Sequence, residues 1–158
     1  MRLAKEGDIL GYRALLSGDR YSSSAEAIDD AQICFIPKSS FLGLLSSNGT
    51  LSMQMMRLLS EDLKHAEHKI TDLAQKPVRE RVAEALLYLH QTYGLENDGV
   101  TISVTLSRED IANIVGTATE TAIRLLSELK NDNIIQLNGK KIAILNHREL
   151  VKVANVND

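Results

Sequence analysis

Apolar residues recur along this chain with changing periods, and each period predicts a different kind of element. In residues 1–48 the apolar runs are short and lie between turn residues. The run AQICFIP, residues 31–37, is typical of a buried strand that ends at Pro37. A short helix is expected to begin at Ser39 or Ser40. Because these residues hold too few strands to cover both faces of a sheet, we expect residues 1–48 to be the end of a larger β domain.

Residues 49–76 follow a second period, in which apolar residues alternate at spacings of three and four, the a/d pattern of a coiled coil. The positions are Met56, Leu59, Leu63, Ala66, Ile70 and Leu73. One interpretation is an amphipathic helix that packs on its own domain. Gly49 and Pro77 bound the run and the β segment before it is small, so the pattern favours a helix that pairs with its twin in a second subunit. The sequence therefore predicts a dimerisation helix over 49–76.

A C-terminal domain is expected over residues 77–158, and it opens with another helix. Pro77 suits the first turn of a helix over 77–93, and Gly94 is a typical stop. The segment VTISVTL, residues 100–106, alternates apolar and polar residues and so predicts a strand.

Two helix starts follow with one glycine between them. Ser107 with Asp110 three positions later is a capping-box pattern, and Thr117 with Glu120 repeats it. Gly116 between them permits the positive φ of a tight turn. A short helix, a glycine turn and a longer helix over about 117–130 together predict a helix-turn-helix.

A β-hairpin is predicted directly after these helices. The runs IIQL (134–137) and KIAIL (141–145) are joined by Asn138-Gly139, a strong short hairpin signal. A hairpin after a helix-turn-helix makes the domain a winged helix. The fold class is therefore α+β, with a β-rich N-terminal segment, a long helix and a C-terminal winged helix-turn-helix.

The outer face of the predicted second helix carries groups that fit base edges in the DNA major groove. Arg124 can donate two hydrogen bonds to guanine, Glu120 can accept from cytosine, and Ile123 can contact a thymine methyl group. Thr119 lies on the same face. Glu120 and Arg124 are also four residues apart, so an alternative is a surface ion pair in which Glu120 serves as part of a helix cap. The helix-turn-helix and wing around them favour DNA contact.

Composition narrows the choice of function. The chain has 158 residues and a net charge of −3, so DNA binding must come from a local arrangement of donors and not from an overall positive field. Its one cysteine, Cys34, is expected to be a buried apolar residue and cannot alone form an intrachain disulfide or an iron–sulfur centre.

There is no glycine-rich phosphate loop, metal-spaced cluster or activated nucleophile, and we expect no enzyme activity. No apolar run approaches the roughly 18 residues of a membrane span.

Over nearly its whole length the sequence resembles the Crp–Fnr (cAMP receptor/Fnr) family of bacterial transcription regulators, most specifically in SREDIANIVGTATETAIRLLSEL, residues 107–129. The resemblance implies a β-roll sensor domain that belongs to the cyclic nucleotide-binding-like class, a dimer helix and a winged helix, in this order. It implies base contacts for Thr119, Glu120, Ile123 and Arg124 on an inverted repeat with a TGA-like core. It also implies contacts to DNA phosphates from Ser107, Arg108, Thr117, Thr121, Asn138 and Lys140.

The sequence departs from the family pattern in two places. A family sensor domain has further residues before Glu6, so we expect only the later part of a β-roll here. In the segment GYRALLSGDRYSSSAEA (11–27), Tyr12 stands where cAMP-binding members have a glutamate for ribose, and Tyr21 where they have an arginine for phosphate. A phosphodiester needs a fixed cation, so cAMP binding is not expected and no cofactor is predicted.

These observations predict a cytoplasmic regulator with no chemistry of its own. Its expected partners are duplex DNA, a second copy of the chain and, by the resemblance, RNA polymerase. An alternative function is a protein-interaction module in which the winged helix and the coiled-coil helix bind another protein without DNA, which a net negative domain would suit.

Overall fold

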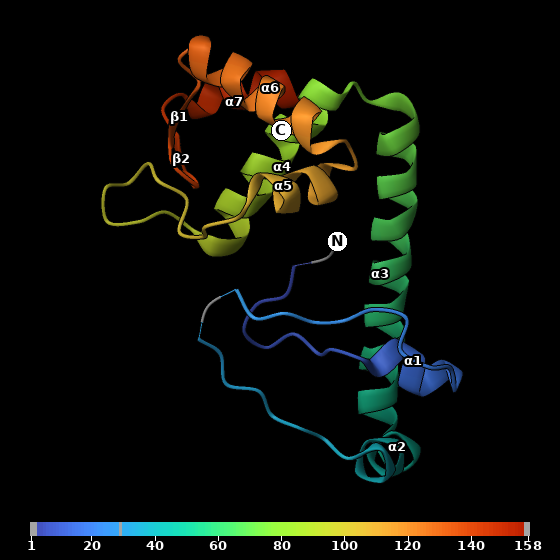
Figure 1. Ribbon diagram of the computed structural model, residues 1–158. Coiled ribbons are helices and arrows are strands. Elements are labelled where there is room, and N and C mark those ends of the chain that lie inside the picture. The colour runs from blue at the N-terminus through green and yellow to red at the C-terminus, as the bar shows by residue number, and fades with distance from the viewer. Residues whose placement is uncertain (1–2, 29, 157–158) are drawn as a thin grey trace. The chain divides into compact units, whose positions relative to one another are not determined.

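The computed structural model of the protein describes residues 3–28 and 30–156, and these form two compact units. Among the described residues, the N-terminal unit comprises 6–28 and 30–71, and the C-terminal unit comprises 72–156 together with 3–5. One long helix, α3 (Gly49–Gln75), contributes residues to both units (Figure 1). The helix that the a/d spacing predicts is therefore present.

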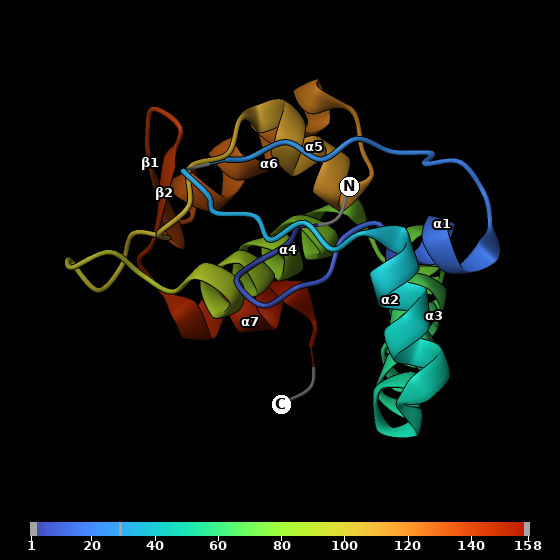
Figure 2. The same ribbon diagram turned by 90° about the horizontal axis from the view of Figure 1, so that it is seen from below.

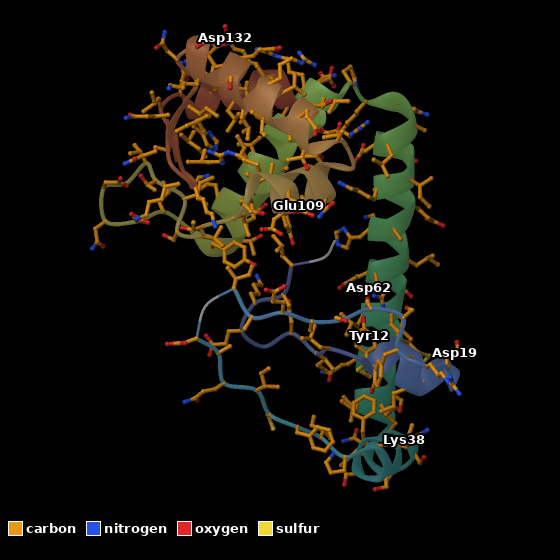
Figure 3. All side chains as sticks on the ribbon, in the orientation of Figure 1. Tyr12, Asp19, Lys38, Asp62, Glu109 and Asp132 are labelled. Atoms are coloured by element: carbon orange, nitrogen blue, oxygen red, sulfur yellow. The ribbon has the colours of Figure 1, made fainter. Side chains whose placement is uncertain are left out.

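The N-terminal unit contains α1 (Tyr12–Ser17), α2 (Lys38–Ser47) and most of α3. Its small core consists of Tyr12, Phe41 and Met55, with half-buried leucines around them. Tyr12 is only 3% exposed, and its hydroxyl donates a hydrogen bond to the carboxylate of Asp62 on α3 (Figure 3). The short helix predicted to begin at Ser39 or Ser40 is confirmed as α2, which begins one or two residues earlier, at Lys38.

The predicted strand over residues 31–37 is wrong. No described residue of the N-terminal unit belongs to a strand, and Ile33 and Phe35 are 82% and 84% exposed. Cys34 is exposed as well, so the expectation that it is buried is also wrong. The physical reason is that a strand is defined by its partner: an apolar extended run without a neighbouring strand has neither ladder hydrogen bonds nor a covered face.

The C-terminal unit is built around α4 (Val78–Tyr93), whose N-cap and C-cap are Pro77 and Gly94. The helix therefore begins one residue later than predicted and ends where predicted. Figure 2 shows α4 between α7 (His147–Ala154) on one side and α5 (Arg108–Val115) and α6 (Thr119–Asn131) on the other. The largest fully buried side chains all lie in this unit: Val82, Leu86, Ile102, Ile111, Val115, Leu126, Leu129, Ile135 and Leu150. This core gives α5 and α6 a rigid base.

The wing is a two-stranded antiparallel sheet of β1 (Ile135–Asn138) and β2 (Lys141–Ile144). Asn138 pairs with Lys141, so the two-residue turn is Gly139-Lys140 and not the predicted Asn138-Gly139. Only Gly139 of this pair has a positive φ, 59°, as a type II′ turn requires at its first central position. The hairpin prediction is thus confirmed, with its turn one residue further along.

The segment 100–106 lies along β2 without becoming a full strand. The Ile102 N–H donates to the Ile142 carbonyl at 2.9 Å, and the Ile144 N–H donates to the Val100 carbonyl at 2.8 Å. Beyond these residues the chain bends at Ser103, and the regular pairing stops. The alternating pattern therefore identified a segment that pairs with the wing but overestimated how far the pairing extends.

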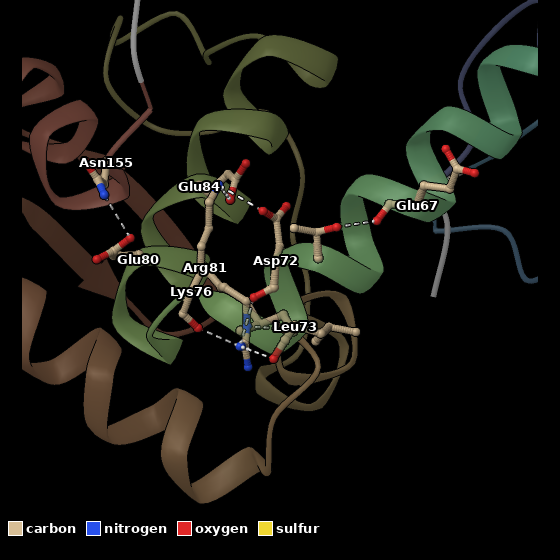
Figure 4. A network of polar contacts seen from close by, with 10 residues as sticks. Glu67, Asp72, Leu73, Lys76, Glu80, Arg81, Glu84 and Asn155 are labelled. Carbon is tan, nitrogen blue, oxygen red and sulfur yellow. Dashed lines mark hydrogen bonds and ion pairs between the residues drawn. The ribbon is translucent and has the colours of Figure 1, made fainter.

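A buried arginine joins the end of α3 to the turn between α5 and α6. The Arg81 guanidinium donates to the carbonyl oxygens of Lys76 at 2.8 Å, Leu73 at 3.3 Å and Asp72 at 3.5 Å (Figure 4). It also donates to the carbonyl oxygens of Val115 at 3.2 Å and Gly116 at 3.3 Å. These carbonyls lie at the C-terminal ends of two helices, where intrahelical partners run out and the helix dipole is negative. A single cation therefore satisfies both helix ends.

Replacing Arg81 by methionine, which keeps much of the volume but removes the donors, is expected to lower the free energy of unfolding by about 2–4 kcal/mol, because buried carbonyls lose charged donors. Urea unfolding followed by far-UV circular dichroism measures this. The control is Arg148→Ala on the exposed surface of α7, which should change stability by less than about 0.5 kcal/mol. Equal stability of the two variants would contradict the assigned role of Arg81.

Candidate nucleic-acid interface

The first helix of the candidate interface begins at a complete capping box. The Ser107 hydroxyl accepts a hydrogen bond from the Asp110 N–H at 3.0 Å, and the Asp110 carboxylate accepts one from the Ser107 N–H at 2.9 Å. Two N–H groups that a helix start leaves unpaired are satisfied in this way. The predicted start of α5 is confirmed.

Gly116 forms the turn that follows α5. Its φ is 74°, and its N–H and that of Thr117 both donate to the Ala112 carbonyl, at 2.8 Å and 3.0 Å. A Cβ atom on Gly116 would lie 2.5 Å from Cδ2 of Leu73. Both the left-handed backbone and the close side chain therefore favour glycine, as the sequence pattern predicts.

The second helix, α6, begins two residues later than the sequence pattern predicts. Its N-cap is Ala118, and no side chain caps it. The Thr117 N–H already bonds back to Ala112, so Thr117 closes the end of α5 and does not cap α6. The prediction of Thr117 and Glu120 as a capping pair is therefore wrong, although the helix itself is present at Thr119–Asn131.

The two faces of α6 separate as the sequence predicts. The inner residues Ala122, Leu125, Leu126 and Leu129 are buried. On the outer face Glu120, Ile123 and Arg124 are exposed, and Thr119 is half-buried. The structure thus brings all four candidate base-contacting residues to the first two turns of one exposed helix face, where a groove-binding helix presents its side chains.

Arg124 is paired with a residue that sequence analysis did not select. Its Nη1 contacts the Glu128 carboxylate one turn further on, and not Glu120, so the alternative of a Glu120–Arg124 ion pair is wrong. Glu120 and Glu128 both lie four residues from Arg124, and a contact from α4 decides which of them is its partner. From its first turn Arg79 reaches Glu128 at 3.0 Å and Asp132 at 2.6 Å. The hydrogen bond to Asp132, followed by the nearby carboxylate charges, raises the pKa of Arg79 against the effect of partial burial.

Arg108 connects the start of α5 to the tip of the wing. Its Nη2 donates to the Gly139 carbonyl at 2.7 Å, while its Nη1 is buried without a protein partner among the described residues. This burial lowers the pKa of the guanidinium from its usual value. Arg108 was selected only as a phosphate-contacting candidate, and the structure gives it a second task in holding the wing against α5.

The remaining phosphate-contacting candidates lie around the same two helices and the wing. Ser107, Thr117 and Thr121 are half-buried, and Asn138 and Lys140 are exposed at the hairpin end. The loop before residue 100 supports the wing, since Glu96 pairs with Lys141 at 2.7 Å. Asp98 of that loop accepts hydrogen bonds from the Thr101 hydroxyl and from the backbone N–H groups of Thr101 and Val100. These bonds lower the pKa of Asp98 to about 2.

The six candidate dimer residues of α3 differ in their surroundings. Met56, Leu63, Ala66, Ile70 and Leu73 are exposed. Leu59 is half-buried and packs on the core of the N-terminal unit, and Leu73 lies near Gly116 in the C-terminal unit. Exposed apolar residues on a long helix are a surface that a partner helix can cover. The dimer stays a prediction.

The residues missed by sequence analysis are Arg79, Glu128 and Asp132. Arg124, Glu128 and Asp132 recur every four residues, a visible signal for ion pairing along one side of a helix. Nothing local in the sequence connects them with Arg79, which is far away along the chain.

Among residues 3–28 and 30–156, no helix is both long and apolar enough to cross a membrane. In the same part of the chain, no three His, Cys, Asp or Glu side chains are grouped as metal ligands.

Comparison with known proteins identifies two family models on this chain. A Crp-like helix-turn-helix domain matches residues 80–153, and a cyclic nucleotide-binding domain matches residues 1–48. A fumarate and nitrate reduction regulatory protein of Vibrio cholerae is 34% identical over 151 residues, which cover 95% of this chain and 60% of the relative. An anaerobic regulatory protein of Bacillus subtilis is 28% identical, and the match covers 65% of the length of that relative. The chain thus spans roughly three-fifths of the length of such curated relatives.

Solved structures show the same architecture. FixK2 of Bradyrhizobium japonicum superposes with a TM-score of 0.68 at 26% identity, over 78% of this chain and 61% of that one. A CRP/FNR-family transcriptional regulator of Thermus thermophilus superposes with a TM-score of 0.63 at 27% identity, over 69% of this chain and 56% of its own length.

Proposed function

Because the chain belongs to the Crp–Fnr family of transcription regulators, we propose that it binds DNA sequence-specifically, as a homodimer on an inverted-repeat operator. The observation that carries this proposal is the outer face of α6, where Glu120, Ile123 and Arg124 stand exposed on a helix fixed from behind by a buried core. Rigid support of this kind keeps side chains in a productive geometry.

In this proposal α6 enters the major groove and its first two turns contact the bases. Arg124 donates to guanine O6 and N7, Glu120 accepts from cytosine N4, Ile123 contacts a thymine methyl group, and Thr119 hydrogen-bonds at the helix start. The phosphate contacts come from Ser107, Arg108, Thr117, Thr121, Asn138 and Lys140. Such contacts set the position of the protein on the duplex and carry no sequence information themselves.

The homodimer forms along α3 in this proposal, through the exposed stripe of Met56, Leu63, Ala66 and Ile70. Leu59 and Leu73 complete the a/d pattern, with part of each side chain already packed within its own protomer. A two-fold dimer places two copies of α6 in successive major grooves, which accounts for the inverted repeat.

The effector is not cAMP in this proposal. Tyr12, at the position of the ribose-binding glutamate, is a core residue whose hydroxyl is used by Asp62. Tyr21 is exposed, and its ring lies over Gly11, where an added Cβ would stand 3.0 Å from its Cε1. No cofactor and no chemical reaction are part of the proposal. In this proposal the protein acts in the cytoplasm and contacts RNA polymerase at the operator.

Binding selection from random duplexes tests the base contacts. Replacing Arg124 by alanine is expected to cost about 1–3 kcal/mol of specific binding and to flatten the preference for guanine at one position of each half-site. Replacing Lys140 by alanine should instead weaken all sequences alike and reduce the salt slope by about one. If wild type and Arg124→Ala recover the same motif equally sharply, Arg124 does not contact a base. A protein that selects no motif at all points to the alternative protein-interaction module.

Leu63→Lys tests the dimer, because it buries an unpaired charge at the centre of the proposed seam. Sedimentation should show monomers, and specific DNA affinity should fall, since one half-site alone binds weakly. The control is His68→Lys, which puts the same charge on the exposed outer face of the same helix and should leave the dimer intact. An unchanged dimer for Leu63→Lys would place the interface elsewhere.

Calorimetry tests the effector proposal. cAMP added to the complete protein, as it is made in the cell, is expected to give no measurable heat of binding and no change in DNA affinity, because the ribose acceptor and the phosphate cation are both replaced by tyrosine. Micromolar cAMP affinity would overturn this part of the proposal.

A further inference from the structure

Four charged side chains form a continuous row beside the candidate base-contacting face. Arg124 contacts one carboxylate oxygen of Glu128, and the other oxygen of Glu128 lies 3.0 Å from Nη1 of Arg79. Nη2 of Arg79 lies 2.6 Å from the carboxylate of Asp132. Each carboxylate oxygen of Glu128 thus has its own guanidinium partner, and the charges alternate along the row.

The fixed point of this row is Arg79. It stands in the first turn of α4, whose packing against α5, α6 and α7 is set by the core, and its side chain is only 35% exposed. Glu128 is held by Arg79, and Arg124 is held by Glu128. The most exposed member, Arg124 at 63%, is therefore connected through two ion pairs to the rigid part of the unit.

An exposed arginine otherwise samples many rotamers, and ordering it on a base costs conformational entropy. A partner that already holds the guanidinium in one orientation reduces that cost at the moment of binding. The contact with Glu128 uses Nη1, and a guanidinium carries five N–H donors in a planar fork. Glu128 can therefore orient Arg124 while other donors of the fork remain for a base edge.

The charge of Glu128 opposes DNA, since it adds repulsion from the phosphates. Arg79 and Arg124 together balance the charges of Glu128 and Asp132, so the row of four has no net charge. A carboxylate that lies between two guanidiniums beside the candidate base-contacting face is well placed to orient one of them.

We propose that Glu128 is a positioning residue that orients Arg124 toward its base and so sets how sharply α6 discriminates at that base, with Arg79 holding Glu128 in place. This inference rests on the proposed function. It assigns Glu128 no contact with DNA and predicts that its effect on specificity passes entirely through Arg124.

Glu128→Gln and Asp132→Asn form a matched pair for the test. Each removes one negative charge from the same side of α6, but only Glu128 contacts Arg124. Competition titrations use the complete protein, the operator selected by wild type, and the same operator changed at the base pair that depends on Arg124. Both variants should bind all duplexes slightly more tightly. Only Glu128→Gln should lower the ratio between the two duplexes, by about two- to fivefold, the range that a partly exposed ion pair supports.

A double-mutant cycle separates positioning from a general electrostatic effect. In an Arg124→Ala background, Glu128→Gln should leave the ratio of affinities for the two duplexes unchanged, because the side chain through which Glu128 acts on the base is absent. Thermal unfolding followed by circular dichroism confirms that all variants fold, as expected for residues this exposed.

The outcomes are distinguishable. If wild type selects no motif, the proposed function fails and the inference with it. If Arg124→Ala flattens the guanine preference but Glu128→Gln leaves it as sharp as Asp132→Asn does, the proposed function stands and the inference is overturned. A sharper preference in Glu128→Gln would overturn it too, since Glu128 would then compete with the base for Arg124.

Discussion

The buried guanidinium of Arg81 is the constraint on which the C-terminal unit depends. It gathers carbonyl oxygens from the end of α3 and from the turn after α5, where backbone acceptors have no helical partner. A helix-turn-helix needs its turn to be rigid, because a small change there moves every side chain of the second helix. Glycine permits this turn, but the arginine gives its last carbonyls a donor and ties them to α4.

Helix α4 carries a second arginine, Arg79, which lies nearer the surface. Arg81 points into the unit and Arg79, two residues earlier, lies at its edge against the outer stripe of α6. α4 thus contacts the turn through the buried Arg81 and the charged residues of α6 through Arg79 at the surface. Through Arg79, α4 contacts the ion-paired residues beside the face that is proposed to contact bases.

The N-terminal unit has a small core that joins α1 to the long helix. Tyr12 fills a small core with Phe41 and Met55 and bonds to Asp62 of α3. The side chain of Tyr12 thereby packs α1 against the long helix. This use of Tyr12 supports the proposal that the effector is not cAMP.

What the sequence determined by itself was local. The Ser107 capping box, the Gly116 turn, the ends of α4 and the wing hairpin each depend on residues a few positions apart, so they could be predicted. Tertiary structure alone decided which carboxylate pairs with Arg124, because Glu120 and Glu128 are equally spaced from it and only Arg79, brought in by α4, favours Glu128. It also decided that residues 31–37 form no strand, because an apolar pattern encodes the tendency to pair but not the presence of a partner.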